Sequence, residues 1–194
     1  MDNSSESTKS SGSRNLTDFG TGVRPSYMAH FVLATTRLAE MAEWYKTVLN
    51  AWEVFRSDRL CFLTFDDEHH RLVLVQNADL KEPQPGTRGL VHVAYSYGSL
   101  GALLSTFKRL REAGISPNRS INHGPTTSFY YYDPDGTNVE LQTDNFETAA
   151  ETHAFMASDE FRRNPIGVLF DADALIRDYE SGVPDRVLKM RPRA

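Results

Sequence analysis

The sequence predicts an α+β fold in which two βαβββ modules pair by pseudo-twofold symmetry around a cleft, followed by a C-terminal helical extension. Two observations support this fold class. The same order of apolar patterns occurs twice, over about residues 27–77 and 89–144, and a segment rich in Pro and Gly, 80–88, separates the copies. A duplicated unit that cannot bury its sheet face alone is expected to pair with its copy.

The first copy begins with an apolar, strand-like run at 28–34. Apolar residues then recur at the spacing of one amphipathic helix: Leu38, Met41, Ala42, Tyr45 and Leu49. Three further strand-like runs follow at 52–56, 60–65 and 72–76. The polar turn 66–70 separates the last two runs, so we expect them to form a hairpin.

The second copy repeats this order, beginning with a strand-like run at 90–95. A helix is predicted from the spacing of Leu100, Leu103, Leu104, Phe107 and Leu110. It should end near Gly114, as helices often end at glycine. Short strands are expected at 115–119, 128–132 and 138–143, with the turn 133–136 (DPDG) between the last two.

The two copies align at one constant offset through their first strand and helix. In this alignment His30 corresponds to His92. In the last strand of each copy, after a small shift, Leu74 corresponds to Glu140. The pseudo-twofold axis should therefore bring the two histidines together in the cleft, with one carboxylate beside them.

The ends of the chain belong to neither copy. Residues 1–24 are polar and serine-rich, which predicts a disordered tail. Residues 147–194 form the extension, with helical patterns at 147–158 and 172–179. We expect this extension to cover a sheet edge or the cleft mouth, or to contact a second subunit.

Composition narrows the class of protein. The chain of 194 residues carries a formal net charge of -5 and has no concentrated basic stripe, so we expect no nucleic-acid partner. It has no apolar run long enough to span a membrane and no apolar signal segment at its start. With one cysteine it cannot form an internal disulfide, which fits a cytoplasmic protein. Exposed sheet edges favour a homodimer.

Three side chains could hold a metal ion: His30, His92 and Glu140. A carboxylate inside an apolar strand faces solvent or is paired with positive charge, because burying it alone is costly. Two imidazoles and one carboxylate on one face is the ligand set of non-haem ferrous enzymes. Leu74, at the position of Glu140 in the first copy, cannot bind a metal, so the site should have three protein ligands.

Three segments carry a resemblance to a known family: 29–33 (AHFVL), 89–95 (GLVHVAY) and 122–142 (NHGPTTSFYYYDPDGTNVELQ). Through them the chain resembles the vicinal oxygen chelate superfamily, and within it the type I extradiol ring-cleavage dioxygenases in their shorter, one-module form. The resemblance covers roughly 27–146, so we expect a domain of this type over 25–146. The third segment is specific as a whole, whereas its DPDG turn alone recurs across the superfamily.

The resemblance implies a role for each candidate residue. His30, His92 and Glu140 match the family's iron ligands, so the expected cofactor is ferrous iron, Fe(II), although Mn(II) would suit the same ligands. His123 matches its histidine acid/base beside bound oxygen. Tyr130 matches its tyrosine that hydrogen-bonds the diol.

The chain also departs from the family pattern. A second non-ligand histidine found upstream of the second ligand in many members has no counterpart over 77–90, so oxygen activation should depend on His123 alone. Tyr130 and Glu140 should face the same way if they lie opposite one another across the turn, with Tyr131 pointing away. His69 and His70 are interpreted as turn residues rather than ligands.

We therefore expect an Fe(II)-dependent extradiol-type dioxygenase that cleaves an aromatic vicinal diol with dioxygen. One alternative is a glyoxalase-type metal isomerase or lyase, which usually has a fourth protein ligand at the position of Leu74. A second is a non-catalytic small-molecule-binding protein of the same superfamily, which needs no metal triad. A third is an oxygenase acting on a polycyclic phenol or quinol, which the same triad would serve.

Overall fold

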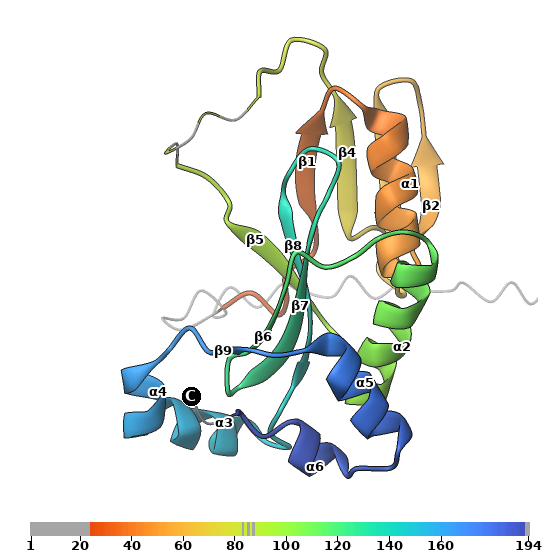
Figure 1. Ribbon diagram of the computed structural model, residues 1–194. Coiled ribbons are helices and arrows are strands. Elements are labelled where there is room, and N and C mark those ends of the chain that lie inside the picture. Colours follow the sequence, from red (N-terminus) through yellow and green to blue (C-terminus); the bar gives the residue numbers. More distant parts are fainter. Residues whose placement is uncertain (1–23, 83, 85, 87, 193–194) are drawn as a thin grey trace, which may run out of the picture.

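The computed structural model describes residues 24–192 apart from 83, 85 and 87. The predicted disordered tail, 1–24, therefore lies outside the described residues except for Arg24. Among the described residues, no helix combines the length and the apolar character needed to cross a bilayer. Two sheets with helices packed on them form the α+β fold (Figure 1).

The first module contains the predicted strand, helix and three further strands: β1 (Phe31–Thr35), α1 (Leu38–Leu49), β2 (Trp52–Arg56), β3 (Leu60–Thr64) and β4 (Leu72–Gln76). Its sheet has the order β1-β4-β3-β2. β1 runs parallel to β4, whereas β3 and β4 form the predicted antiparallel hairpin. The buried face of α1 carries the residues that its 3.6-residue spacing predicted, except that Val48 rather than Leu49 is fully buried.

The second module repeats the topology: β5 (His92–Ser96), α2 (Leu100–Glu112), β6 (Arg119–Asn122), β7 (Thr126–Tyr132) and β8 (Asn138–Asp144). Its sheet has the order β5-β8-β7-β6, with β9 (Val168–Leu169) added at the edge. The predicted strand at 115–119 is wrong, because the chain there first closes α2. The Ile115 N–H donates to the Leu110 carbonyl at the end of the helix. Pro117 has no backbone N–H and cannot donate a hydrogen bond to a neighbouring strand.

The two modules contact each other through the sides that carry their helices. Residues of α1, α2 and both sheets form one core. Arg109 of α2 donates to the carbonyls of Thr47 and, at 3.2 Å, Val48 in α1. The Tyr45 hydroxyl of α1 donates to Asp133 Oδ2 at 2.9 Å, just beyond β7. In Figure 1 α1 and α2 accordingly follow one another along the same side of the molecule.

The opposite face of the first sheet carries an apolar row of side chains. The strand register places Val32 beside Val73, Val73 beside Phe62, and Phe62 beside Phe55. We call these four residues the first row. Val32 is 54% exposed and Phe55 is 51% exposed, so both ends of this row are open to solvent.

The second sheet carries a row at the equivalent positions. Ala94 lies beside Glu140, Glu140 beside Tyr130, and Tyr130 beside Arg119. We call these four residues the second row. The register confirms that Tyr130 and Glu140 face the same way, and Tyr131 points into the core as predicted.

The equivalent rows correct one residue of the alignment made from sequence. Val73, not Leu74, occupies the position that Glu140 has in the second module, because Val73 pairs with Val32 as Glu140 pairs with Ala94. Leu74 points to the other face and is fully buried in the core. Side chains alternate between the faces of a strand, so a shift of one residue exchanges the faces. Valine binds no metal either, so the expectation of three protein ligands is unchanged.

The C-terminal extension folds onto the second module. It contains the two helices expected from sequence, α3 (Ala149–Met156) and α5 (Ala172–Glu180), and three elements that were not predicted: α4 (Asp159–Arg163), β9 and α6 (Asp185–Leu188). β9 pairs with the edge strand β6, which confirms that the extension covers a sheet edge. Leu175 and Ile176 of α5 join the common core.

Candidate active site

Glu140 lies at the centre of a polar cluster on the second row. Its side chain comes from the middle of β8 and is only 5% exposed. His92 begins β5, two residues before Ala94, and the alternation of a strand turns it to the same face. Its Nε2 lies 3.1 Å from Glu140 Oε2. The structure therefore brings two of the predicted ligands together.

His123 reaches the same cluster from the end of β6. Its Nε2 lies 3.8 Å from Glu140 Oε1 and 2.9 Å from the Tyr130 hydroxyl oxygen. His123 thus lies close to the predicted ligand Glu140 and is hydrogen-bonded to Tyr130, the other residue predicted to take part in proton transfer.

A backbone carbonyl of the C-terminal extension holds the other side of the His123 ring. Nδ1 of His123 is hydrogen-bonded to the Ile166 carbonyl oxygen. A carbonyl can only accept, so we assign the proton of the neutral ring to Nδ1. Nε2 then carries the lone pair, and the Tyr130 hydroxyl donates to it. Sequence reasoning missed Ile166, because the acceptor is a main-chain atom and no side chain indicates it.

The turn that presents this carbonyl is held by its own hydrogen bonds. The Asn164 amide donates to the Gly167 carbonyl at 2.8 Å, and its oxygen accepts from the Gly167 N–H at 2.9 Å. Gly167 has φ +110°, a region that side chains with a Cβ rarely adopt. A Cβ there would lie 2.5 Å from the Asn122 carbonyl oxygen and 2.8 Å from His123 Cα. Only glycine therefore lets this turn approach the histidine so closely.

The surroundings of Tyr130 keep its hydroxyl protonated. Burial is the main cause that raises the pKa of Tyr130, and the neighbouring Glu140 raises it further. The Arg119 guanidinium, 4.3 Å from the centre of the Tyr130 ring, lowers the pKa by a smaller amount. Tyr130 is consequently a hydrogen-bond donor at neutral pH, as its contact with His123 requires.

His30 is placed apart from this cluster. It directly precedes β1, and its ring lies 4.3 Å from the ring of His70 and 6.5 Å from that of His69, centre to centre. Within the described part of the chain, no ion pair joins His30 to Glu140. Nor does any group of three or more His, Cys, Asp or Glu side chains there lie close enough to hold a metal ion. One chain therefore brings together His92 and Glu140 but not the third predicted ligand.

The donors in the cluster nevertheless fit a divalent metal. A buried carboxylate needs positive charge nearby, and Glu140 has imidazole nitrogens within 4 Å on both of its oxygens. Imidazole and carboxylate are ligands that suit ferrous iron and manganese. His92 and Glu140 would supply two of the three donors, and His30 is the predicted third.

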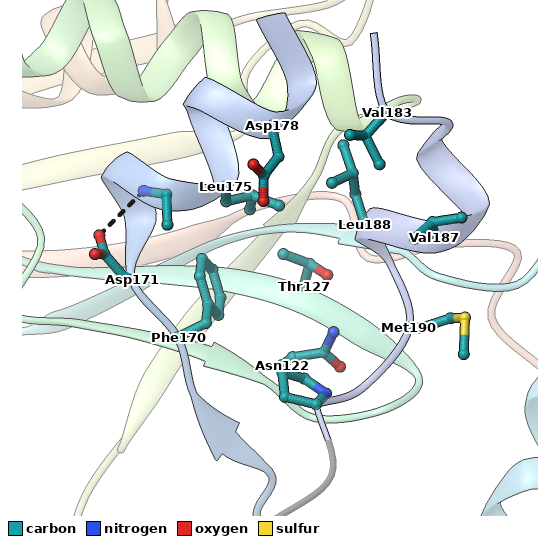
Figure 2. A pocket seen from close by; sticks show the side chains of 12 residues that line it. Asn122, Thr127, Phe170, Asp171, Leu175, Asp178, Val183, Val187, Leu188 and Met190 are labelled. Atoms are coloured by element: carbon teal, nitrogen blue, oxygen red, sulfur yellow. Dashed lines mark hydrogen bonds between the residues drawn. The ribbon is translucent and has the colours of Figure 1, made fainter. Parts of the chain in front are cut away.

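A cavity of about 300 Å³ lies elsewhere, between the C-terminal extension and the second sheet (Figure 2). Its lining includes Asn122, Phe170 and Leu175, and Phe170 packs against Phe129 of the core with ring centres 5.6 Å apart. None of the five candidate site residues is among the described residues that line it. This cavity is therefore lined by other residues than the cluster around Glu140.

Fold, repeat and cluster together define the class of protein. Residues 27–141 match the Glyoxalase/Bleomycin resistance protein/Dioxygenase superfamily, and the chain belongs to this superfamily. It is 47% identical over 161 residues to biphenyl-2,3-diol 1,2-dioxygenase 2 of Rhodococcus globerulus, a match that covers 82% of this chain and 85% of the relative. It is 44% identical over 166 residues to biphenyl-2,3-diol 1,2-dioxygenase 3 of the same organism, covering 84% and 87%.

Solved structures agree on the fold. The lactoylglutathione lyase of Agrobacterium tumefaciens aligns with a TM-score of 0.50 and 21% identity, over 61% of this chain and 94% of that chain. At this identity the likeness concerns the fold alone. The family resemblance predicted from the three sequence segments is thus confirmed.

Proposed function

We propose that this protein is a metal-dependent extradiol ring-cleavage dioxygenase, an enzyme that opens an aromatic vicinal diol with dioxygen. The observation that carries the proposal is the contact of His92, His123 and Tyr130 around the buried Glu140. This cluster lies in a chain 47% identical to a biphenyl-2,3-diol 1,2-dioxygenase. In the reaction the ring bond next to the diol breaks, and one atom of dioxygen enters a new carboxylic acid while the other enters a new carbonyl group at the opposite end of the opened ring.

His30, His92 and Glu140 would hold the metal, with ferrous iron the expected ion and Mn(II) suited to the same donors. The metal would supply charge stabilisation and a template for the diol oxygens and dioxygen. The proposal includes the pseudo-twofold pairing of the two rows around a metal cleft, a homodimer, and a cytoplasmic enzyme without nucleic-acid or membrane partners.

The protein's own groups would orient the diol and move the proton. The protonated Tyr130 hydroxyl donates a hydrogen bond to His123, and it can donate to a diol oxygen instead when the substrate is bound. Nε2 of His123, unprotonated in the neutral ring, can then take a proton and return it to the product as the ring opens. The Ile166 carbonyl favours this exchange, because an acceptor at Nδ1 stabilises the imidazolium that forms.

A glyoxalase-type isomerase is less well supported. Such enzymes usually have a fourth protein ligand at the position of Glu140 in the other module. Val73 occupies that position here, and it has no donor atom. A non-catalytic binding protein would need neither the buried carboxylate nor the paired His123 and Tyr130.

The test is oxygen uptake after anaerobic reconstitution with ferrous iron, with biphenyl-2,3-diol and catechol as probes. Wild type should consume oxygen and give a yellow ring-opened product, and His92→Ala should lose both. His153→Ala, which changes an exposed histidine of α3, is the matched control and should behave as wild type. Tight iron binding without uptake on any diol would overturn the dioxygenase and favour an isomerase. Absence of metal binding would favour a binding protein.

A further inference from the structure

We propose that residues 188–191 of the extension, the C-terminal segment, position His123 for proton transfer. The Lys189 carbonyl of this segment holds the residue that precedes the histidine, and the Arg191 guanidinium holds the turn that presents the Ile166 carbonyl. The inference rests on the proposed function, because it concerns the acid/base residue of the same reaction. The segment lies outside residues 27–141, which match the superfamily, so this role belongs to the extension.

The first attachment runs through Asn122, the last residue of β6 and the neighbour of His123. Asn122 is only 3% exposed, and its Nδ2 donates to the Lys189 carbonyl oxygen at 3.1 Å. Its Oδ1 accepts from the Gly124 N–H at 2.9 Å. One buried amide therefore ties the C-terminal segment to the residues on both sides of the histidine. Figure 2 shows Asn122 beside this segment, which carries Met190.

The second attachment runs through Arg191, whose Nη2 donates to the Asn164 carbonyl oxygen at 2.7 Å. Asn164 begins the turn that its side chain closes on Gly167, and Ile166 lies within this turn. Hydrogen bonds from a charged donor are stronger than those between neutral groups. Arg191 therefore supports the turn whose Ile166 carbonyl is hydrogen-bonded to Nδ1 of His123.

Other contacts restrain the backbone of His123 rather than its ring. The His123 N–H donates to the Thr126 carbonyl oxygen at 2.9 Å. The Phe155 ring closes over Gly124, where a Cβ would lie 2.1 Å from a carbon of that ring. These contacts do not involve the turn at Ile166. Loss of the support for that turn should therefore release the ring of the histidine without releasing its backbone.

The C-terminal segment is itself fixed to the second module. Leu188 packs against the common core. The Lys189 N–H donates to the Asp185 carbonyl oxygen at 2.8 Å where α6 ends. Only Met190 separates Lys189 from Arg191, so a shift of this segment would move both supports of the histidine together.

Loss of the Ile166 contact has a specific consequence for the His123 ring. The hydrogen bond at one nitrogen of a neutral imidazole decides which nitrogen carries the proton. With the carbonyl at Nδ1, the proton stays on Nδ1 and Nε2 can accept. Without the carbonyl the proton can move to Nε2, which then cannot take a proton from the diol. A misplaced ring is also costly, since an error of about 1 Å in a reacting geometry can cost roughly 100-fold in rate.

The test compares Arg191→Ala with Arg186→Ala, which removes an exposed arginine of α6 in the same extension. The position of the proton on His123 is read by heteronuclear NMR of protein with isotopically labelled histidine, and His123→Gln identifies the signals of this ring. Zinc replaces ferrous iron, because it is diamagnetic and suits the same donors. His123 is not a proposed ligand, so the proton can be located whether or not the metal binds.

Wild type and Arg186→Ala should carry the His123 proton on Nδ1 alone, whereas Arg191→Ala should show both tautomers. Arg191→Lys keeps a charged donor for the Asn164 carbonyl and should return most of the ring to the wild-type tautomer. A substitution that only weakened the fold would not change the tautomer of the folded protein.

Oxygen uptake of the iron-loaded protein gives the second measurement. Rates are expressed per bound iron, so that a loss of folded protein does not count as a loss of rate. In Arg191→Ala kcat should fall about 10-fold, because orientation is only a part of the roughly 10²–10⁴-fold that acid–base catalysis contributes. The iron content and the KM for the diol should stay at their wild-type values, and Arg191→Lys should recover most of kcat.

Asn122→Asp tests the other attachment. Aspartate keeps the acceptor for the Gly124 N–H and places an oxygen against the Lys189 carbonyl, so kcat per bound iron should again fall about 10-fold. Asn77→Asp is the matched control, because the exposed Asn77 accepts from the Asp79 N–H at 3.0 Å in the same local arrangement. It should leave kcat unchanged.

An unchanged tautomer in Arg191→Ala would overturn the positioning of the ring, and an unchanged kcat per bound iron would overturn its role in the reaction. Equal losses in Arg186→Ala would overturn the proposal too, because they would show a general effect of the extension. A wild-type protein that consumes no oxygen with any diol would instead overturn the proposed function. The tautomer of His123 would then still decide whether the C-terminal segment positions this ring.

Discussion

The two modules share one topology but use equivalent positions differently. Where the second row has Glu140 and Tyr130, the first row has Val73 and Phe62. The first module's predicted ligand, His30, directly precedes β1 and lies beside the ring of His70. Equivalent positions of the two sheets thus carry apolar side chains in the first row and mostly polar ones in the second.

The edges of the two sheets differ in the same way. β6 of the second module is paired with β9 of the extension, and the extension also holds His123 through Ile166. β2 of the first module has its five residues exposed. The extension therefore both covers the sheet edge and contacts His123, the proposed acid/base residue, on the same module.

The largest contrast should come from Glu140 and Val73. Glu140→Gln removes the charge and keeps the shape, so iron affinity should fall by more than about 100-fold. Val73→Ala should keep the iron and lower the free energy of unfolding by about 2 kcal/mol, since it removes buried apolar volume. Anaerobic dialysis with iron analysis and urea unfolding measure the two effects. Equal losses of iron would show that the two rows do not differ in this role.

The turn that presents the Ile166 carbonyl to His123 is tested by comparing a substitution at Gly167 with one at Gly182. Gly167→Ala forces a Cβ against Asn122 and His123 as well as an unfavourable φ, so unfolding should require about 3 kcal/mol less. Gly182→Ala, at φ +86° with nothing within 4 Å, should lose only about 1 kcal/mol. Urea unfolding of both variants is the measurement. Similar losses would mean that the turn does not press on the His123 backbone.

The chemistry of the second row is tested by Tyr130 against Tyr132. Tyr130→Phe removes the donor to His123 and makes this position resemble Phe62 of the first row. We expect kcat/KM to fall about 10–100-fold, the equivalent of one hydrogen bond in a charged site. Tyr132→Phe changes an exposed hydroxyl and should leave kcat/KM unchanged. Oxygen uptake at varied diol concentration measures kcat/KM for both variants. An unchanged kcat/KM in Tyr130→Phe would show that this hydroxyl takes no part in the reaction.

The junction between the modules gives the smallest and a pH-dependent effect. Burial raises the pKa of Asp133, and the Tyr45 hydroxyl bond lowers it again. Because the folded pKa lies above the unfolded one, this carboxyl's contribution to stability declines as pH rises between the two values. Tyr45→Phe removes the hydrogen bond that lowers the pKa of Asp133, so it should raise the folded pKa further. The free energy of unfolding should fall by about 2 kcal/mol at pH 7, and by less as the pH approaches 4, where the carboxyl is protonated.

Tyr131→Phe is the control for this junction. Its hydroxyl is buried without a hydrogen-bond partner among the described residues, so its removal should cost nothing at either pH. Urea unfolding at both pH values compares the two variants. A Tyr45→Phe cost that does not change with pH would exclude Asp133 as the titrating group.

Sequence patterns predicted much of this architecture because each pattern has a local cause. Helical spacing placed α1 and α2, and strand alternation predicted that Tyr130 and Glu140 face the same way if they lie opposite one another, which the register confirms. The face of a strand was harder to predict from one alignment, and a shift of one residue put Leu74 where Val73 stands. Strand β6 was misplaced because the chain after α2 first satisfies the carbonyls of the helix end.

Other features depend on contacts between distant segments and leave no local pattern. Among the described residues, the two-residue strand β9 pairs with β6 alone, a strand that lies far away in the sequence. The contact between Ile166 and His123 joins a main-chain atom to a ring that lies far away in the sequence. The packing of one module on the other was equally inaccessible, since the amphipathic helices predict a buried side but not its partner.

The acceptor that orients His123 belongs to the main chain, and this has an evolutionary consequence. The Ile166 side chain is 70% exposed, so almost any residue at 166 would still present the same carbonyl. Selection on the geometry should therefore act on its neighbours, Asn164 and Gly167, while position 166 drifts. In an alignment of related sequences, position 166 would then be variable, although every protein would keep the hydrogen bond from the histidine to the main-chain carbonyl at this position.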